Sequence, residues 1–201
     1  MLVTRWGHSC VRFEAGGRAL VVDPGIWTED EAFADADAVL LTHHHRDHAD
    51  MTRIARIGVP VVAPRDAVLG DSDDPSTIRV DAGQAFEVAG FTVHATGGQH
   101  AKVVDDAPAV ANLGYLVDGV YHPGDALHVP DVPVTTLLVP MQASWLATRD
   151  AIAFVREVAP ARAVGIHDGQ INERAIDSIS WWLQRAASCG FDWVPPGTDL
   201  S

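Results

Sequence analysis

The chain has little that would hold it together covalently or anchor it in a membrane. Only two of its 201 residues are cysteines, Cys10 and Cys189, and they lie near opposite ends of the sequence. We expect both to be free thiols in a reducing compartment. No apolar run approaches the ~20 residues of a membrane-spanning helix, and the first residues lack the apolar stretch of a signal peptide. The sequence therefore predicts a cytoplasmic protein with no membrane partner.

Positive charge is also scarce. Lys and Arg total 14 against 27 Asp and Glu, which gives a formal net charge of −13 at pH 7. Binding to a nucleic-acid backbone needs clustered Lys and Arg, so this balance argues against a nucleic-acid partner. The 47% hydrophobic and 20% charged residues are ordinary for a globular protein. We expect one domain over residues 1–201 that acts on a small-molecule substrate, and self-association into a homo-oligomer stays open.

What the chain does have is a dense cluster of imidazoles and carboxylates after a short apolar run. Residues 39–41 predict a buried strand, and the polar cluster occupies residues 43–48 at its end. His43 and His45 are two residues apart, so an extended backbone points both rings to the same side. Asp47 and His48 follow where the chain turns toward a helix. Such a set can serve two adjacent metal ions, and it suits zinc, with manganese or iron as alternatives. A solvated His-rich turn is the competing interpretation.

The spacing His-x-His-x-Asp-His, complete at His43, His45, Asp47 and His48, resembles that of the metallo-β-lactamase-fold hydrolases. The resemblance extends over essentially the whole chain. It implies an α/β (α+β) fold built as a four-layer αββα sandwich. It also implies two divalent metal ions, Zn²⁺ first and Mn²⁺ or Fe²⁺ as alternatives. Within the superfamily, the chain looks most like the small hydrolases that include the ascorbate-phosphate lactonase-like proteins.

The same resemblance implies three further ligands, each after a later strand. His100 follows two glycines, which let the backbone approach a bound ion closely. Asp125 lies in a Gly-Asp turn, the superfamily's position for a carboxylate that bridges both metals, and His167 ends the last internal strand. One site would then comprise His43, His45 and His100, and the other Asp47, His48 and His167, with Asp125 between them.

Three more residues are second-tier candidates. His8 lies in a Gly-His turn that is typical of this subgroup and lies near its site, although a structural role is the alternative. Asp23 ends a strand, where it either hydrogen-bonds to a ligating histidine or caps the turn. The third is His122, which flanks Asp125 together with His128. Either of them can serve as a proton donor, but packing or surface roles are favoured for both.

Hydrophobic periodicity predicts the remaining elements. Strands are expected at residues 2–6, 10–14, 19–22, 59–63, 85–88, 91–95, 113–117, 120–122, 134–139 and 163–166. Helices are expected at residues 50–57, 148–158 and 176–190, with one helical turn at 65–69 and an acidic loop at 71–75. Trp181 and Trp182 are expected to pack in the core and at the edge of the last helix.

The chemistry that the resemblance implies is hydrolysis. A metal-bound water loses its proton near neutral pH and, held between two ions, can attack a carbonyl or phosphoryl centre. Asp47 would orient this nucleophile as well as bind metal. The predicted substrate is a small ester, lactone or phosphodiester, with a lactone slightly favoured. The alternative is a non-catalytic metal-binding sensor or scaffold with the same fold.

Overall fold

The computed structural model describes residues 1–70 and 76–200, so the acidic loop expected at 71–75 lies outside the described residues. The described strands form two seven-stranded sheets. The first sheet has the order β14 (Thr198–Asp199), β1 (Leu2–Arg5), β2 (Val11–Ala15), β3 (Arg18–Val22), β4 (Ala38–Leu40), β5 (Val61–Pro64) and β6 (Ile78–Val80). The second has the order β13 (Gly190–Asp192), β12 (Arg162–Ile166), β11 (Thr136–Pro140), β10 (Val120–His122), β9 (Ala111–Val117), β8 (Phe91–Gln99) and β7 (Ala85–Val88).

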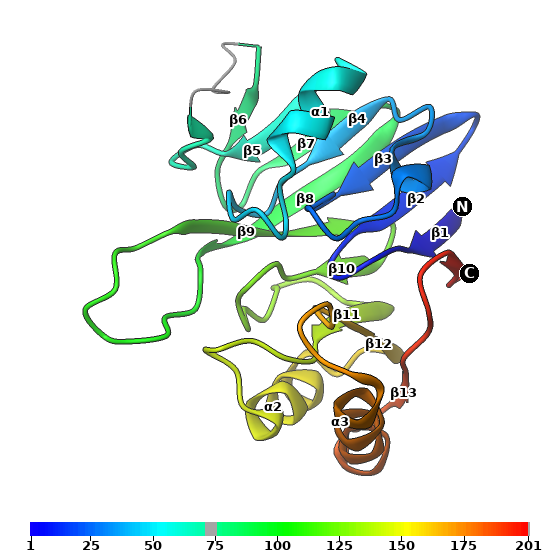
Figure 1. Ribbon diagram of the computed structural model, residues 1–201, viewed down its shortest axis with the longest axis vertical. Helices are drawn as coiled ribbons and strands as arrows, with labels where there is room; N and C mark the ends of the chain where they lie inside the picture. The colour runs from blue at the N-terminus through cyan, green and yellow to red at the C-terminus, as the bar shows by residue number, and fades with distance from the viewer. Residues whose placement is uncertain (71–75, 201) are drawn as a thin grey trace.

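The two sheets are packed face to face between helices (Figure 1). Helix α1 (Met51–Ile57) covers the outside of the first sheet, where Ile54 packs with Val21 and Val39. Helices α2 (Thr148–Val158) and α3 (Glu173–Ala186) cover the outside of the second. A third apolar cluster fills the space between the sheets. These layers confirm the predicted αββα sandwich. In the part of the chain that is described, no helix is both long enough and apolar enough to cross a bilayer.

Both sheets repeat one plan, which brings the site residues to a common edge. Strands β1, β2 and β3 are antiparallel, and β3 to β6 are parallel. In the second sheet β7 to β10 are antiparallel, and β10 to β13 are parallel. Strands β4 and β5, in the parallel half of the first sheet, consist only of apolar residues because both of their faces are covered. Polar site residues follow the carboxyl ends of β3, β4, β10 and β12, which is where α/β sheets place their ligand sites.

Several sequence-based expectations are confirmed by this arrangement. The predicted helix at 148–158 is α2 with the same bounds. Helix α1 begins as expected with Asp50, whose side chain accepts a hydrogen bond from the Arg53 backbone N–H, and ends at Gly58 in the left-handed conformation. The hairpin turn between β9 and β10 has positive φ at Asp118 and Gly119, as the Asp-Gly pair predicts.

Other expectations were wrong, mostly where an element depends on distant partners. Strands β6, β13 and β14 were not predicted, because each has only two or three residues and, unlike the equally short β4, no continuous apolar run. Residues 65–69 contain a turn and no helix. Strand β8 continues to Gln99, since Gly97 and Gly98 pair with β9 despite lacking side chains. Helix α3 ends at Ala186, and Gly190 opens β13.

The packing expected of Trp181 and Trp182 was also wrong. Their exposed fractions are 49% and 52%. The buried stripe of α3 comprises Ile176, Ile179 and Leu183, which contact the core of the second sheet. The two tryptophans directly precede Leu183, so the 3.6-residue helical repeat places them off this stripe.

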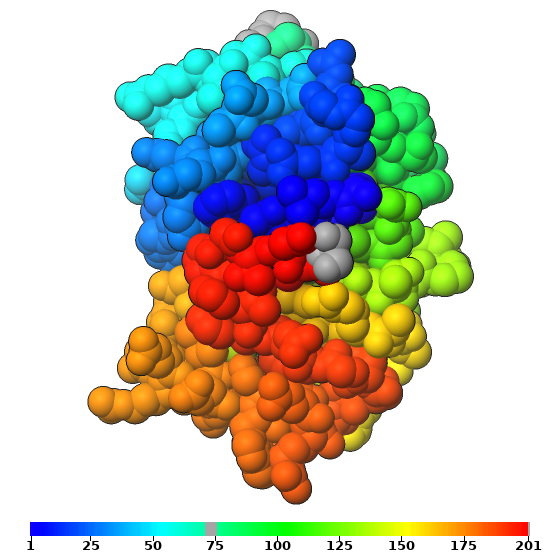
Figure 2. All heavy atoms as spheres, turned by 90° about the vertical axis from the view of Figure 1, so that its right-hand side faces the viewer, coloured from blue at the N-terminus to red at the C-terminus, as the bar shows by residue number. Residues whose placement is uncertain are grey.

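The two ends of the chain meet in the first sheet. Strand β14 pairs with β1 in antiparallel register, with Thr4 opposite Asp199. The Leu200 N–H donates to the Val3 carbonyl at 2.7 Å. Figure 2 shows the first and last segments of the chain side by side on one face of the molecule. The last strand therefore crosses from the second sheet to close the edge of the first.

Both cysteines are free, as predicted, and their burial makes them differ in reactivity. Cys10 is fully buried, and burial raises the pKa of its thiol. Cys189 is only half-buried, and burial raises the pKa of its thiol as well. We expect a thiol-specific reagent to modify Cys189 slowly in the native protein and Cys10 only after unfolding. Mass spectrometry of the labelled protein before and after denaturation measures this. Rapid labelling of native Cys10 would contradict it.

Candidate metal centre

The turn after β4 carries the largest share of the candidate ligands and is fixed by contacts from both sheets. The Leu113 N–H of β9 donates to the Thr42 carbonyl at 2.9 Å, and the Tyr115 hydroxyl donates to the Leu41 carbonyl at 3.0 Å. On the other side, Gly25 approaches the Asp47 backbone so closely that a Cβ at Gly25 would lie 1.8 Å from the Asp47 carbonyl oxygen. Only glycine fits there, which explains the Asp-Pro-Gly turn after β3.

The first candidate site comprises His43, His45 and His100, as predicted from the sequence. One ligand nitrogen from each lies within 4.8 Å of the others. The ring centroid of His43 lies 4.7 Å from that of His45 and 4.9 Å from that of His100. His100 comes from the second sheet, at the end of β8, so this group bridges the two sheets. Three convergent imidazoles are a zinc-type donor set.

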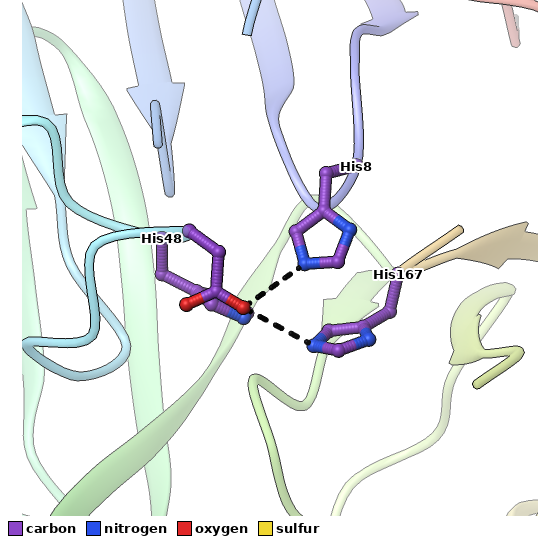
Figure 3. A group of neighbouring side chains, drawn as sticks. His8, His48 and His167 are labelled. Atoms are coloured by element: carbon purple, nitrogen blue, oxygen red, sulfur yellow. Dashed lines mark hydrogen bonds and ion pairs between the residues drawn. The ribbon is translucent and has the colours of Figure 1, made fainter. Parts of the chain in front are cut away.

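The second candidate site comprises Asp47, His48 and His167, and His8 joins it. Ligand atoms of these four side chains also lie within 4.8 Å of one another. Figure 3 shows His8 and His167 with one ring nitrogen each directed at a carboxylate oxygen beside His48. That oxygen is Oδ2 of Asp47, at 3.3 Å from Nε2 of His8 and 3.9 Å from Nε2 of His167.

Asp125 lies between the two groups and presents one oxygen to each. Its Oδ1 is 3.1 Å from Nε2 of His48 and 3.2 Å from Nε2 of His167. Its Oδ2 is 3.3 Å from Nε2 of His100. The residue is 4% exposed. This is the placement expected of a carboxylate that bridges two cations, and all seven predicted ligands therefore converge; their binding of metal stays a prediction.

The hydrogen bonds of the histidines decide which nitrogen faces the centre. The Nδ1 atom of His43 lies 3.0 Å from the Thr42 hydroxyl, and that of His48 lies 2.7 Å from Oδ2 of Asp23. The Nδ1 atoms of His100 and His167 are bonded to the backbone carbonyls of Ala101 and Gln142. Because these partners accept, the Nδ1 atom of each ring carries a proton, which leaves Nε2 as the nitrogen that can bind a metal ion.

Those Nε2 lone pairs have no hydrogen-bond partner in the described structure. The buried side-chain atoms without a partner include Nε2 of His43, His48, His100 and His167, together with Oδ1 of Asp125. A buried polar atom left unpaired costs free energy, so five of them in one place need an explanation. Divalent cations supply it, since ligating histidines characteristically donate their other N–H to a carbonyl or carboxylate. The residues present therefore fit a metal centre.

Asp23 contacts the ring of His48 on the Nδ1 side, opposite the Nε2 atom that faces Asp125. It is fully buried and accepts hydrogen bonds from the Thr42 backbone N–H at 2.7 Å and from the Thr42 hydroxyl at 2.6 Å. Its third contact is with Nδ1 of His48. Of the two roles considered for Asp23, the structure favours the hydrogen bond to a ligating histidine.

We expect Asp23→Asn to weaken metal binding by about 10–100-fold, the usual effect of losing such a supporting contact. Asparagine has one acceptor oxygen where Asp23 uses two, so its NH2 group must face either the Thr42 N–H or the His48 Nδ1–H, and His48 also loses the negative charge that makes the ring more basic. Competition with a chromophoric chelator measures the affinity. Asp37→Asn is the control, because Asp37 caps the Ala19 backbone N–H far from the centre. Unchanged affinity in Asp23→Asn would contradict this role.

His8 contacts the site as a hydrogen-bond donor. Its Nδ1 accepts from the Gly169 N–H at 3.0 Å, so the proton of the neutral ring is on Nε2, which faces Asp47. Burial lowers the pKa of His8 to about 4, although the hydrogen bond to Asp47 acts in the opposite direction. The ring is therefore neutral near pH 7 and holds the Asp47 carboxylate in place.

The charges of the other groups suit a cation. Burial lowers the pKa of His43 well below its usual value, so that ring is neutral. Burial would raise the pKa of Asp47, but the hydrogen bond from His8 and the nearby His48 bring it down to about 2. Burial likewise opposes the ionised form of Asp125, but His48 holds its pKa well below the usual range. The ionised carboxylates of Asp47 and Asp125, beside the neutral ring of His43, form a site that attracts positive charge.

Three residues of the centre have strained backbone conformations. His8, Asp23 and His167 have φ values of 58°, 50° and 59°. Aspartate tolerates this left-handed region, but each histidine there costs about 1–3 kcal/mol. Each follows a strand or opens a tight turn, and the His167 N–H donates to the His8 carbonyl at 2.9 Å. The two strained turns thus hold each other, and both rings are directed at Asp47.

His122 is not positioned as a proton donor to substrate. It is 1% exposed, its Nε2 donates to the Ser9 carbonyl at 2.7 Å, and its Nδ1 accepts from the Gly124 N–H. Both nitrogens are therefore occupied in fixing the turn before Asp125. This confirms the packing role that the sequence favoured. His128 is exposed, as a surface histidine is expected to be.

Sequence reasoning missed one residue that contacts the centre. The indole N–H of Trp145 donates to Oδ2 of Asp125 at 3.2 Å, and its ring lies 6.1 Å from the ring of His100. Trp145 follows β11, a strand that supplies no predicted ligand, so no spacing pointed to it. Trp27 contacts the opposite side, with its ring 4.9 Å from that of His8 and 41% of its surface exposed.

Comparison with known proteins places this geometry in a family. The profile described as the beta-lactamase superfamily domain matches residues 2–167. The chain belongs to the beta-lactamase superfamily. The match runs from β1 to His167 and so includes every residue of both candidate sites. The resemblance drawn from the spacing of residues 43–48 is thereby confirmed.

Individual members of the superfamily resemble the chain along most of its length. It is 36% identical to Protein Rv0786c of Mycobacterium tuberculosis, over 83% of this chain and 84% of that protein. It is 29% identical to a UPF0173 metal-dependent hydrolase of Methanoregula boonei, over 100% of this chain and 97% of that protein. Igni18, a metallo hydrolase from Ignicoccus hospitalis, has the same fold, with a TM-score of 0.76 at 20% identity over 99% and 97% of the two chains. Together with the His and Asp clusters, these relationships support the coarse class of a metal-dependent hydrolase.

Proposed function

We propose that this member of the superfamily hydrolyses a small ester, lactone or phosphodiester at a centre of two divalent cations. The observation that carries the proposal is the set of four buried Nε2 atoms and one carboxylate oxygen that have no partner and face a common space. Zn²⁺ suits a set rich in imidazole, and Mn²⁺ or Fe²⁺ are the alternatives. Bound there, two such cations would supply an activated water and polarise the bond to be cleaved.

The protein's own residues divide the remaining tasks. His43, His45 and His100 would hold one cation, and His48 and His167 with Asp47 the other, with Asp125 shared. Asp47 lies at the edge of its group, 22% exposed, where its free oxygen can orient a water against the substrate. His8 fixes that carboxylate through Nε2. Trp27 and Trp145 would form two walls against which a small apolar or planar part of the substrate can pack.

The competing proposal is a metal-binding sensor or scaffold that keeps the centre without catalysis. A panel of one p-nitrophenyl ester, one γ-lactone and bis(p-nitrophenyl) phosphate, assayed with metal-loaded protein, distinguishes the two. A hydrolase should turn over at least one compound, and turnover should stop after chelation and return when metal is restored. Elemental analysis of the purified protein should find two metal ions per chain. Two bound metals with no turnover of any compound would favour the scaffold.

A further inference from the structure

A cavity of about 590 Å³ opens beside the ligand turn on the side of α1. Its walls include His44 and Arg46 from the turn, Arg53 and Arg56 from α1, and the apolar side chains of Ile26 and Leu69. Among the described residues that line the cavity, the one carboxylate is that of Asp50, and it is neutralised by an ion pair with Nε of Arg53 at 2.8 Å. The cavity thus has a net positive lining in a chain whose formal charge is −13.

The arginines of this cavity differ from the others in the chain. Thirteen of its 14 basic residues are arginines, and ten of these have an ion pair, a hydrogen bond or a ring contact through the side chain. Over residues 1–70 and 76–200, the guanidinium groups without such a contact are those of Arg46, Arg56 and Arg174. Two of these three line the same cavity. No described side chain on the cavity wall balances their positive charge, so this lining favours an anion.

His44 adds a polar atom to the same wall. Its Nδ1 is buried and has no hydrogen-bond partner. Its ring lies 5.2 Å from that of His45, which brings the cavity wall to the edge of the first metal group. Arg46 directly precedes Asp47 of the second group. The two turn residues on the cavity wall, His44 and Arg46, are therefore each next in the chain to candidate metal ligands.

We infer that this cavity is a subsite for an anionic group of the substrate, a carboxylate or a phosphate monoester, held by Arg46 and Arg56 with His44 beside them. The inference rests on the proposed hydrolase and narrows its substrate to a molecule that carries a negatively charged group away from the bond that is cleaved. Guanidinium groups bind both kinds of oxyanion through paired N–H donors. Arg53 has a different task, because its contacts with Asp50, Thr28 and Gly25 hold the cavity wall in place.

The kinetic test compares two esters that differ in the charge of the acyl tail. These are p-nitrophenyl pentanoate, which is neutral, and the p-nitrophenyl monoester of glutaric acid, which ends in a carboxylate. In the variant Arg46→Gln with Arg56→Gln, we expect the ratio of kcat/KM for the anionic ester to that for the neutral ester to fall at least ~10-fold, mainly through KM. The control is Arg174→Gln. Arg174 is the third of the unpaired arginines and lies on α3, away from the cavity, so its loss should leave the ratio unchanged. An unchanged ratio in the double variant, or an equal fall in Arg174→Gln, would overturn the inference.

A binding test separates this inference from the proposed function. Calorimetric titration of the metal-loaded protein with inorganic phosphate and with glutarate should show weaker binding of one or both in the double variant than in the wild type. The ligand that loses more affinity identifies which oxyanion the subsite prefers, since any binding at the metals is common to both proteins. If the wild type cleaves neither ester and no compound of the substrate panel, the proposed function fails while this titration still decides the subsite. Equal affinities of the wild type and the double variant for both ligands would contradict the subsite and leave the proposed hydrolase function unaffected.

Discussion

Replacing Asp125 with alanine should abolish hydrolysis and lower the metal content of the purified protein. Its two oxygens lie 3.1–3.3 Å from the ring nitrogens of His48, His167 and His100, so one carboxylate serves both candidate sites. Removing it takes away a negative charge from a buried space where positive charge must be held. We expect a fall in kcat/KM on the order of 1000-fold or more, comparable to the loss of a directly stabilising group in other enzymes.

The experiment separates charge from shape by including Asp125→Asn, which keeps the side chain's size. Both variants should lose metal, because a neutral amide is a weak bridging ligand. The control is Asp177→Ala, an exposed carboxylate on α3 that contacts neither group. Metal is counted by elemental analysis and activity by the substrate panel. Full activity in Asp125→Ala with normal metal content would remove Asp125 from the centre and end the two-cation proposal.

The largest effect on stability is expected from Arg5→Ala. Arg5 is fully buried beneath the His167 turn, where its guanidinium forms an ion pair with Asp168 and donates to the Val194 carbonyl at 3.0 Å. The Trp193 indole donates to the same Asp168 oxygen at 2.6 Å. Removing Arg5 leaves a buried carboxylate without its cation, which typically costs about 3–5 kcal/mol of unfolding free energy. For a chain of this size, each kcal/mol lowers Tm by about 2–4 °C.

Denaturant titration of wild type and variant measures this loss. Arg5→Met combined with Asp168→Asn should recover much of the lost unfolding free energy, because the destabilisation comes from the buried charge without a partner and not from the absence of the ion pair. Arg149→Ala is the matched control, since its side chain is 86% exposed and pairs with Asp150 at the surface. An unfolding free energy in Arg5→Ala equal to that of the control would show that the buried pair contributes nothing to stability.

How much of the centre the sequence predicts depends on how local each contact is. The group at 43–48 is a single turn, so its spacing alone indicated which rings share a side. His100, Asp125 and His167 were placed through family resemblance, because only the packing of two sheets brings β8, β10 and β12 against β4. The contact of Trp145 with Asp125 depends on a loop that no periodicity describes, and it was missed.

The supporting residues show the same limit in another way. Asp23 was recognised as a candidate because it ends a strand beside a turn, and His8 because its Gly-His turn is typical of the subgroup that the chain resembles. Their roles required hydrogen-bond geometry, since the choice of Asp23 between capping a turn and orienting His48 depends on where that ring's Nδ1 points. In the fold, the short strands β13 and β14 form by pairing with residues more than twenty positions away. The residues near each strand in the sequence do not indicate which distant strand it pairs with.

The candidate ligands come from both sheets, and this has a consequence for how the sandwich is held closed. The two sheets face each other mainly through side chains, and the chain has no disulfide between them. Cations bound by His43, His48, His100 and His167 would act as cross-links between the halves of the molecule. The reinforcement would be independent of the redox state of the surroundings and governed by the supply of metal. A chelator would then do to this protein what a reductant does to a secreted one.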